Sequence, residues 1–130
     1  MALEIVTPPE LARPRGYSHG VKGRGEVLFV AGQIGWDAQG RVVSPDFVAQ
    51  FGQALDNVLA VVRAAGGTPE SIGRMVVYVT DKDEYARCTP ALGQAWRERL
   101  GKHYPAMALV QVAALLEPGA KVEIEATALL

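Results

Sequence analysis

The sequence contains little of what several protein classes require. A single cysteine, Cys88, excludes an internal disulfide and a cysteine-based zinc site. The charge is nearly balanced, with 13 Lys and Arg against 14 Asp and Glu, which argues against a general nucleic-acid binder. No apolar run reaches the length needed to cross a membrane. The early Glu4 and the nearby prolines do not suit a signal peptide, so we expect a soluble, cytoplasmic protein.

Motifs for cofactor binding and covalent catalysis are also missing. The segment Gly23–Gly25 lacks the lysine and the spacing of a phosphate-binding loop and is more typical of a hairpin turn. His19 and His103 are far apart in the sequence, and neither has a second ligand at metal-binding spacing. None of the serines lies in a nucleophile motif. We therefore expect no cofactor and no metal.

The stretch Phe47 to Ala65 carries the strongest periodicity in the chain. Its large apolar residues recur at steps of three and four, which places them on one face of an α-helix: Phe47, Phe51, Leu55, Val58, Leu59 and Val62. Gln50 falls elsewhere on the helical wheel. Asp46 or Ser44 is a candidate N-cap, and Gly66-Gly67 provides a C-terminal stop. The pattern predicts a helix that covers a sheet with its apolar face.

Apolar runs bounded by glycine, proline or charged residues predict the strands. They cover Leu3–Val6, Tyr17–Lys22, Val27–Ala31, Met75–Val79, Ala106–Ala114 and Lys121–Leu130. Asp81–Glu84 is expected to form a charged turn. A second helix follows, with Thr89 as N-cap and Pro90 in the first helical position, and it ends at Gly101. This order predicts one α+β domain, residues 1–130, with both helices on one face of a mixed sheet.

Two helices can cover only one face of such a sheet. Yet Val27–Ala31, Met75–Val79 and Ala106–Val112 are apolar at alternate positions on both faces. A bare apolar face would be an unusually large exposed patch for a monomer. We therefore expect an oligomer whose interface covers the second face.

Strand alternation in the last segment separates two kinds of residue. Val122 and Ile124 point to one face, and Glu123 and Glu125 point to the other. Two interpretations of these carboxylates remain open. The pattern alone favours carboxylates that are solvated or paired with arginines at the interface, because such pairs are common on strands. The alternative is a carboxylate in an intersubunit cleft that handles the proton of a water molecule.

Several segments together resemble the RidA family, which is also called YjgF or L-PSP-like. They are Tyr17–Val21, Leu28–Ile34, Gln53–Val58, Val79–Asp81, Pro105-Ala106 and Val122–Ala126. The resemblance runs in register from Tyr17 to Ala128. It implies a chorismate-mutase-like α+β fold and a homotrimer with a small-molecule ligand in each of three intersubunit clefts. It also implies hydrolysis of reactive enamines and imines, such as 2-aminoacrylate, to 2-keto acids and ammonia.

The resemblance further implies which residues form each cleft. Glu123 would position a water molecule, and Tyr17 would orient the ligand. Four other positions would contact the ligand: Gly32, Thr89, Met107 and Leu109.

Met107 departs from the family pattern. The family has an arginine at this position, and it holds the substrate carboxylate with a two-pronged set of hydrogen bonds. Ala31 and Leu109 also replace a serine and a cysteine, so the cleft is expected to be more apolar than in the family. Arg15 and Arg24 are candidates for supplying the lost charge.

Two functions follow as hypotheses. The first is a hydrolase or deaminase of small enamine-like or imine-like metabolites. The second is a non-catalytic small-molecule-binding or interaction protein on the same trimeric scaffold. A ribonuclease or translation-inhibitor role, described for some family members, receives no support from the near-neutral charge, because binding a phosphate backbone calls for clustered Lys and Arg.

Overall fold

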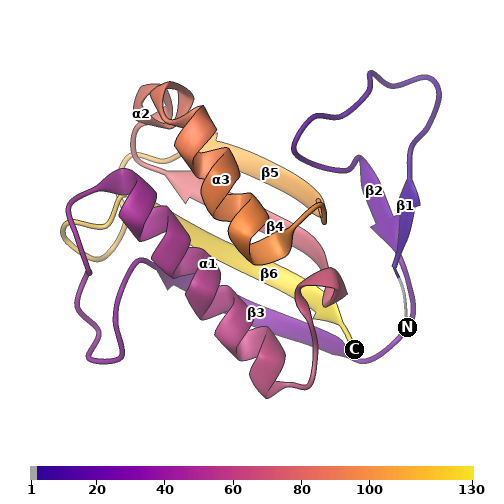
Figure 1. Cartoon of the computed structure of the whole chain (residues 1–130), viewed down its shortest axis with the longest axis horizontal. Coiled ribbons are helices and arrows are strands. Elements are labelled where there is room, and N and C mark those ends of the chain that lie inside the picture. Colours follow the sequence, from indigo (N-terminus) through magenta and orange to yellow (C-terminus); the bar gives the residue numbers. More distant parts are fainter. Residues whose placement is uncertain (1–2) are drawn as a thin grey trace.

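The computed structural model describes residues 3–130, and it has the predicted mixed α+β architecture. In chain order the elements are β1 (Glu4–Val6), β2 (Gly20–Lys22), β3 (Val27–Ile34), α1 (Phe47–Ala64), the 3₁₀ turn η1 (Pro69–Ser71), β4 (Ile72–Val79), α2 (Lys82–Arg87), α3 (Thr89–Leu100), β5 (Ala106–Gln111) and β6 (Val122–Leu129). Helices α1 and α3 lie side by side on one face of the larger sheet, and the β1–β2 hairpin stands beside it (Figure 1). No helix within the described residues has the length and hydropathy of a membrane span.

The larger sheet has the strand order β3-β6-β4-β5. The last strand, β6, is central and pairs antiparallel with both β3 and β4. β4 and β5 are parallel, because α2 and α3 form the crossover that joins them. Mixed pairing of this kind agrees with the fold class predicted from the sequence.

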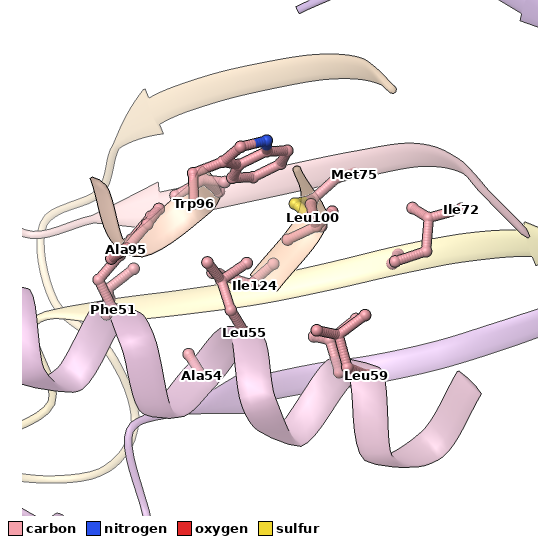
Figure 2. Packing of buried hydrophobic residues seen from close by; sticks show 14 of the residues in the cluster. Phe51, Ala54, Leu55, Leu59, Ile72, Met75, Ala95, Trp96, Leu100 and Ile124 are labelled. Atoms are coloured by element: carbon pink, nitrogen blue, oxygen red, sulfur yellow. The ribbon is translucent and has the colours of Figure 1, made fainter. Parts of the chain in front are cut away.

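The predicted long helix is present as α1. Asp46 is its N-cap and accepts a hydrogen bond from the backbone N–H of Ala49 at 2.9 Å. Leu55 and Val58 are fully buried, and Figure 2 shows α1 side chains packed with those of α3 and the strands. The apolar face predicted from periodicity therefore covers the sheet.

Gln50 is not on a solvated side of α1, as its place on the wheel suggested. It is fully buried, and its Nε2 donates to the carbonyl oxygens of Ser44 at 2.8 Å and Gly119 at 2.9 Å. Its Oε1 accepts from the backbone N–H of Lys121 at 2.8 Å. Two loops close over the start of the helix, and Gln50 supplies hydrogen bonds that their buried backbone groups would otherwise lack.

Strand β3 continues past Gly32, where the sequence predicted a break. The pairing of β3 with β6 shifts register between Val30 and Gln33, which marks an irregularity of the β-bulge type. A glycine is expected at such a position, so it bends the strand without ending it.

The charged turn predicted at Asp81–Glu84 is instead the start of a short helix, α2. The Asp81 side chain accepts hydrogen bonds from the backbone N–H groups of Asp83 at 3.0 Å and Glu84 at 3.1 Å, which is an N-cap. Helix α3 then starts with Thr89 as its first residue and Cys88 as its cap, one residue earlier than predicted.

The second face of the sheet carries both apolar and charged groups. On β3, Phe29 is 79% exposed and Val27 is 53% exposed. Beside them, β4 and β6 place Tyr78, Glu123 and Glu125 on the same face. The second face is therefore apolar at β3, as predicted, and it carries the two carboxylates of β6, which strand alternation had also placed there.

Candidate functional site

A pocket of about 230 Å³ opens between α3 and the edge strand β5. Three of the predicted ligand-contacting residues line it, namely Thr89, Met107 and Leu109. A second pocket shares Met107 and Leu109 with it and adds Arg15 and Tyr17. We call the two together the α3–β5 hollow.

The pairing of β5 with β4 places Met107 and Leu109 in the hollow. Met107 lies opposite Met75, and Leu109 lies opposite Val77, in parallel register. Met75 and Val77 are fully buried under the helices, so Met107 and Leu109 point to the same face of the sheet. Because β5 is the edge strand, its two side chains are only half-buried.

Tyr17 reaches the hollow because the segment before β2 is tied to the start of β5. The backbone N–H of Ser18 donates to the carbonyl oxygen of Pro105 at 3.0 Å. The Ser18 hydroxyl donates to the backbone carbonyl oxygen of Tyr104 at 2.5 Å. The Tyr17 ring packs edge-on against His19, with 5.4 Å between ring centroids. These contacts hold Tyr17 beside residues that lie far along the chain.

Aromatic side chains form much of the wall. Trp96 stacks on Tyr104 with a centroid distance of 6.0 Å, and its indole N–H donates to the carbonyl oxygen of His103 at 3.1 Å. The Tyr85 hydroxyl is protonated at neutral pH, as an ordinary phenol is, and burial raises its pKa further. Since Tyr85 lines the hollow, its hydroxyl can donate to a ligand oxygen. The hollow therefore combines an apolar body with a few polar groups, as small-molecule sites do.

Glu123 and Gly32 meet on the other side of the sheet. Val122 and Ile124, the neighbours of Glu123, are fully buried under the helices, so Glu123 points to the opposite face. A Cβ atom at Gly32 would lie 2.7 Å from the carboxylate Oε2 of Glu123, so any larger residue at position 32 would require the Glu123 side chain to move. Glu125, two residues on, accepts a hydrogen bond from the Tyr78 hydroxyl.

Within one copy, the predicted site residues therefore form two groups. Tyr17, Thr89, Met107 and Leu109 surround the α3–β5 hollow, on the side of the helices. Gly32 and Glu123 lie together on the opposite face.

The structure also distinguishes the candidate cations. Arg15 lines the hollow beside Tyr17, whereas Arg24 lies in the turn before β3 and is not among the lining residues. A third arginine, Arg97 of α3, lines the deeper part of the hollow and was missed from the sequence. The signal for it was present: Thr89, Gly93 and Arg97 recur at steps of four, which places them on one helix face.

The chain has clear relatives. The family model for Endoribonuclease L-PSP matches residues 9–130. A RutC family protein from Pyrococcus horikoshii is 32% identical over 127 residues, covering 96% of each chain. A Salmonella typhimurium protein named 2-iminobutanoate/2-iminopropanoate deaminase is 34% identical over 128 residues, covering 98% of each chain. The crystal structure of YyfB from Yersinia pestis, described as a protein of unknown function of the conserved Rid protein family, has a TM-score of 0.84 and 34% identity, with full coverage of both chains. This chain therefore belongs to the family of RidA, YjgF and L-PSP proteins.

Proposed function

We propose that this protein hydrolyses imines of the form R–C(=NH)–COO⁻, or the enamines that tautomerise to them, in a cleft formed by two copies of the chain. One copy supplies the α3–β5 hollow, and the other supplies Glu123 and Gly32. The observation that carries the proposal is the position of Glu123, whose carboxylate lies directly against Gly32, where a side chain would displace it. The name of the Salmonella relative, an imine deaminase, supports the same class of reaction.

The chemistry requires a water molecule and a group that moves its proton. The water oxygen bonds to the imine carbon, the C–N bond breaks, and the products are R–C(=O)–COO⁻ and NH₃. Glu123 would accept a proton from the attacking water and pass it to the nitrogen. It would then pass the proton of the new hydroxyl group to the same nitrogen as the C–N bond breaks, so it acts as a general base and then a general acid in each transfer. Tyr17 would hold the ligand from the side of the hollow.

A second copy is needed because the sheet separates the two groups within one copy. The exposed Phe29 and Val27 lie on the same face as Glu123, and a partner subunit packed there would cover them. The homotrimer that the family resemblance implies would meet this requirement three times, with one cleft at each interface.

The test is the release of 2-keto acid and ammonia from imines that an amino-acid oxidase generates in the same solution. We expect the protein to accelerate release above the rate in water, and Glu123→Gln to lose at least about 100-fold of that acceleration. Glu117→Gln, an exposed carboxylate in a loop, is the matched control and should retain full activity.

Two results would contradict the hydrolase. One is the absence of any acceleration, for imines with small and with large side chains alike. The other is full activity in Glu123→Gln. If a keto acid still binds to the inactive protein, the binding-protein hypothesis takes the place of the hydrolase, and the apolar residues Met107 and Leu109 then define a changed ligand.

A further inference from the structure

Three residues of α3 form a stripe along the α3–β5 hollow. Thr89, Gly93 and Arg97 are spaced by four, and all three line the hollow. In a helix, long side chains point back toward the N-terminus, over the preceding turn. The guanidinium of Arg97 accordingly lies beside Gly93, one turn before it.

Gly93 is the unusual member of this stripe. Glycine within a helix is destabilising relative to alanine, because it loses more backbone freedom on folding. A Cβ atom at Gly93 would lie 3.0 Å from Nη1 of Arg97, so even a methyl group would require the guanidinium to shift by about a few tenths of an ångström. The glycine therefore leaves the space in which the arginine lies over the hollow.

The charge around the hollow is of one sign. Arg15 and Arg97 line it, and none of the residues that line its two parts is acidic. The five ion pairs within residues 3–130 use Lys22, Arg41, Arg99 and Lys121, and none of them involves Arg97. A cation that borders an apolar hollow and has no carboxylate partner suits an anionic ligand.

The rest of the wall is apolar and limits the size of the ligand. Trp96, Leu92, Phe51 and Met107 contribute to it. The first pocket of the hollow, which these residues line, has a volume of about 230 Å³, and this is smaller than the roughly 300–1,000 Å³ of sites for drug-sized ligands. A small acid with one branched or aromatic side chain matches both the size and the apolar surface.

We infer that Arg97 holds the carboxylate of 2-imino acids and 2-oxo acids whose side chain is branched or aromatic, and that the apolar wall of the hollow binds that side chain. This inference rests on the proposed hydrolase for its choice of acid. Arg97 would take over the task that an arginine at position 107 has in the family, from the helix instead of the strand. Gly93 is a positioning residue, because it acts only by leaving room for the guanidinium.

Arg97 is a better candidate for this role than Arg15. Arg97 belongs to a helix whose buried residues anchor it to the core, and it borders the deeper, apolar part of the hollow. Both arginines are exposed, but Arg15 lies on the loop before β2 and lines only the second pocket. A side chain bound against Trp96 would bring the carboxylate of a small acid closer to α3 than to that loop.

Titration calorimetry with three probes tests the inference without any turnover. The probes are 4-methyl-2-oxopentanoate, pyruvate, and the neutral ketone 4-methylpentan-2-one. We expect the branched acid to bind at least about tenfold more tightly than pyruvate, because its larger side chain buries more apolar surface. The neutral ketone reports the apolar contacts alone.

Variants then separate the charge from the shape of the site. Arg97→Gln should weaken the binding of the branched acid about 10- to 100-fold and leave the Kd of the neutral ketone unchanged. Arg97→Lys should recover part of the lost affinity. Gly93→Ala should bind the branched acid several-fold more weakly, although the Tm of this variant should be equal to or higher than that of the wild-type protein. A merely structural role of Gly93 would not produce this combination. Arg63→Gln, an exposed arginine on α1, is the control and should change nothing.

Any of three results would overturn the inference. The first is a branched acid that binds no more tightly than pyruvate. The second is an unchanged Kd of the branched acid in Arg97→Gln. The third is a loss of affinity for that acid in Arg15→Gln and not in Arg97→Gln. The hydrolase proposal is tested separately. Binding as expected with no imine hydrolysis would refute only the hydrolase. Imine hydrolysis with an unchanged KM in Arg97→Gln would refute only the role of Arg97.

Discussion

Glu123 and Met107 lie on opposite faces of the same sheet. Met107 is in register with Met75, which is buried under the helices, and Glu123 alternates with Val122 and Ile124, which are also buried there. Within residues 3–130 of one copy, the pockets that Met107 lines do not include Glu123. A site that uses both must be built from two copies, so assembly and activity are expected to depend on each other.

The first prediction concerns assembly. We expect light scattering at micromolar concentration to give three times the 13.9 kDa mass of the chain. Phe29→Lys should reduce that mass, because it places a charge on the 79%-exposed apolar side chain of the face that we assign to the interface. The same variant should lose imine hydrolysis while its far-UV circular dichroism is retained. A monomeric wild-type protein would contradict both the interface and the shared cleft.

The second prediction concerns the replaced arginine. Because Met107 cannot pair with a carboxylate, Arg97 alone would hold the carboxylate of 2-iminopropanoate. The side chain of this imine is also too small to use the apolar wall, so we expect its hydrolysis to be slow. Met107→Arg should accelerate this reaction about 10- to 100-fold, since a charge-assisted hydrogen bond contributes about 1.5–3 kcal/mol. It should slow the hydrolysis of the leucine-derived imine, because the new side chain occupies the hollow.

The control for this change of preference, from the leucine-derived imine to 2-iminopropanoate, is the double variant Met107→Arg/Glu123→Gln. It should be inactive on both imines. Rapid hydrolysis of 2-iminopropanoate by the wild-type protein would show that Met107 does not limit the reaction with small acids. The ratio of kcat/KM for the two imines is the quantity to compare, because it cancels differences in the amount of active protein.

The third prediction concerns Gln50. Gln50→Leu keeps a similar volume but leaves two carbonyl groups and one N–H group without their partner. Each unsatisfied buried group costs about 1–3 kcal/mol, so we expect the free energy of unfolding to fall by at least about 2 kcal/mol. Urea denaturation at one fixed protein concentration measures it, since assembly would otherwise shift the midpoint. Gln94→Leu, on the exposed side of α3, should change it by no more than about 0.5 kcal/mol.

The fourth prediction concerns pH. The hydrogen bond from the Tyr78 hydroxyl to Glu125 is the main cause that raises the pKa of Tyr78, and desolvation and the charge of Glu125 act in the same direction. This bond exists only while the phenol is neutral. Its contribution to stability is therefore complete below the unfolded-state pKa of about 10, and it is lost as the pH rises through the higher folded-state value.

Two measurements check this sign. The destabilisation caused by Tyr78→Phe should be equal at pH 7 and pH 9 and should shrink above about pH 10. In an ultraviolet titration of the folded protein, Glu125→Ala should lower the pKa of one of the four tyrosines. Identical titrations of wild type and Glu125→Ala would show that the pair does not form in solution.

Much of the fold was predictable because its signals are local. The apolar positions of α1 repeat within a few residues, so its phase, its Asp46 cap and its glycine stop were predicted correctly. Where a local signal had two meanings, the prediction failed. Aspartate is typical of a turn and also of an N-cap. Only the hydrogen bonds that Asp81 accepts from the backbone N–H groups of Asp83 and Glu84 identify it as the N-cap of α2.

The sequence by itself determined the periodicities, the family, and the separation of Glu123 from Val122 and Ile124 onto opposite faces, because alternation along a strand depends only on the strand. The tertiary structure decided which distant residues meet. Strand order brings Met107 beside α3, the irregularity in β3 brings Gly32 under Glu123, and the helix brings Arg97 over the hollow. These contacts join segments tens of residues apart, and their geometry depends on how whole elements pack, which no short stretch of sequence specifies.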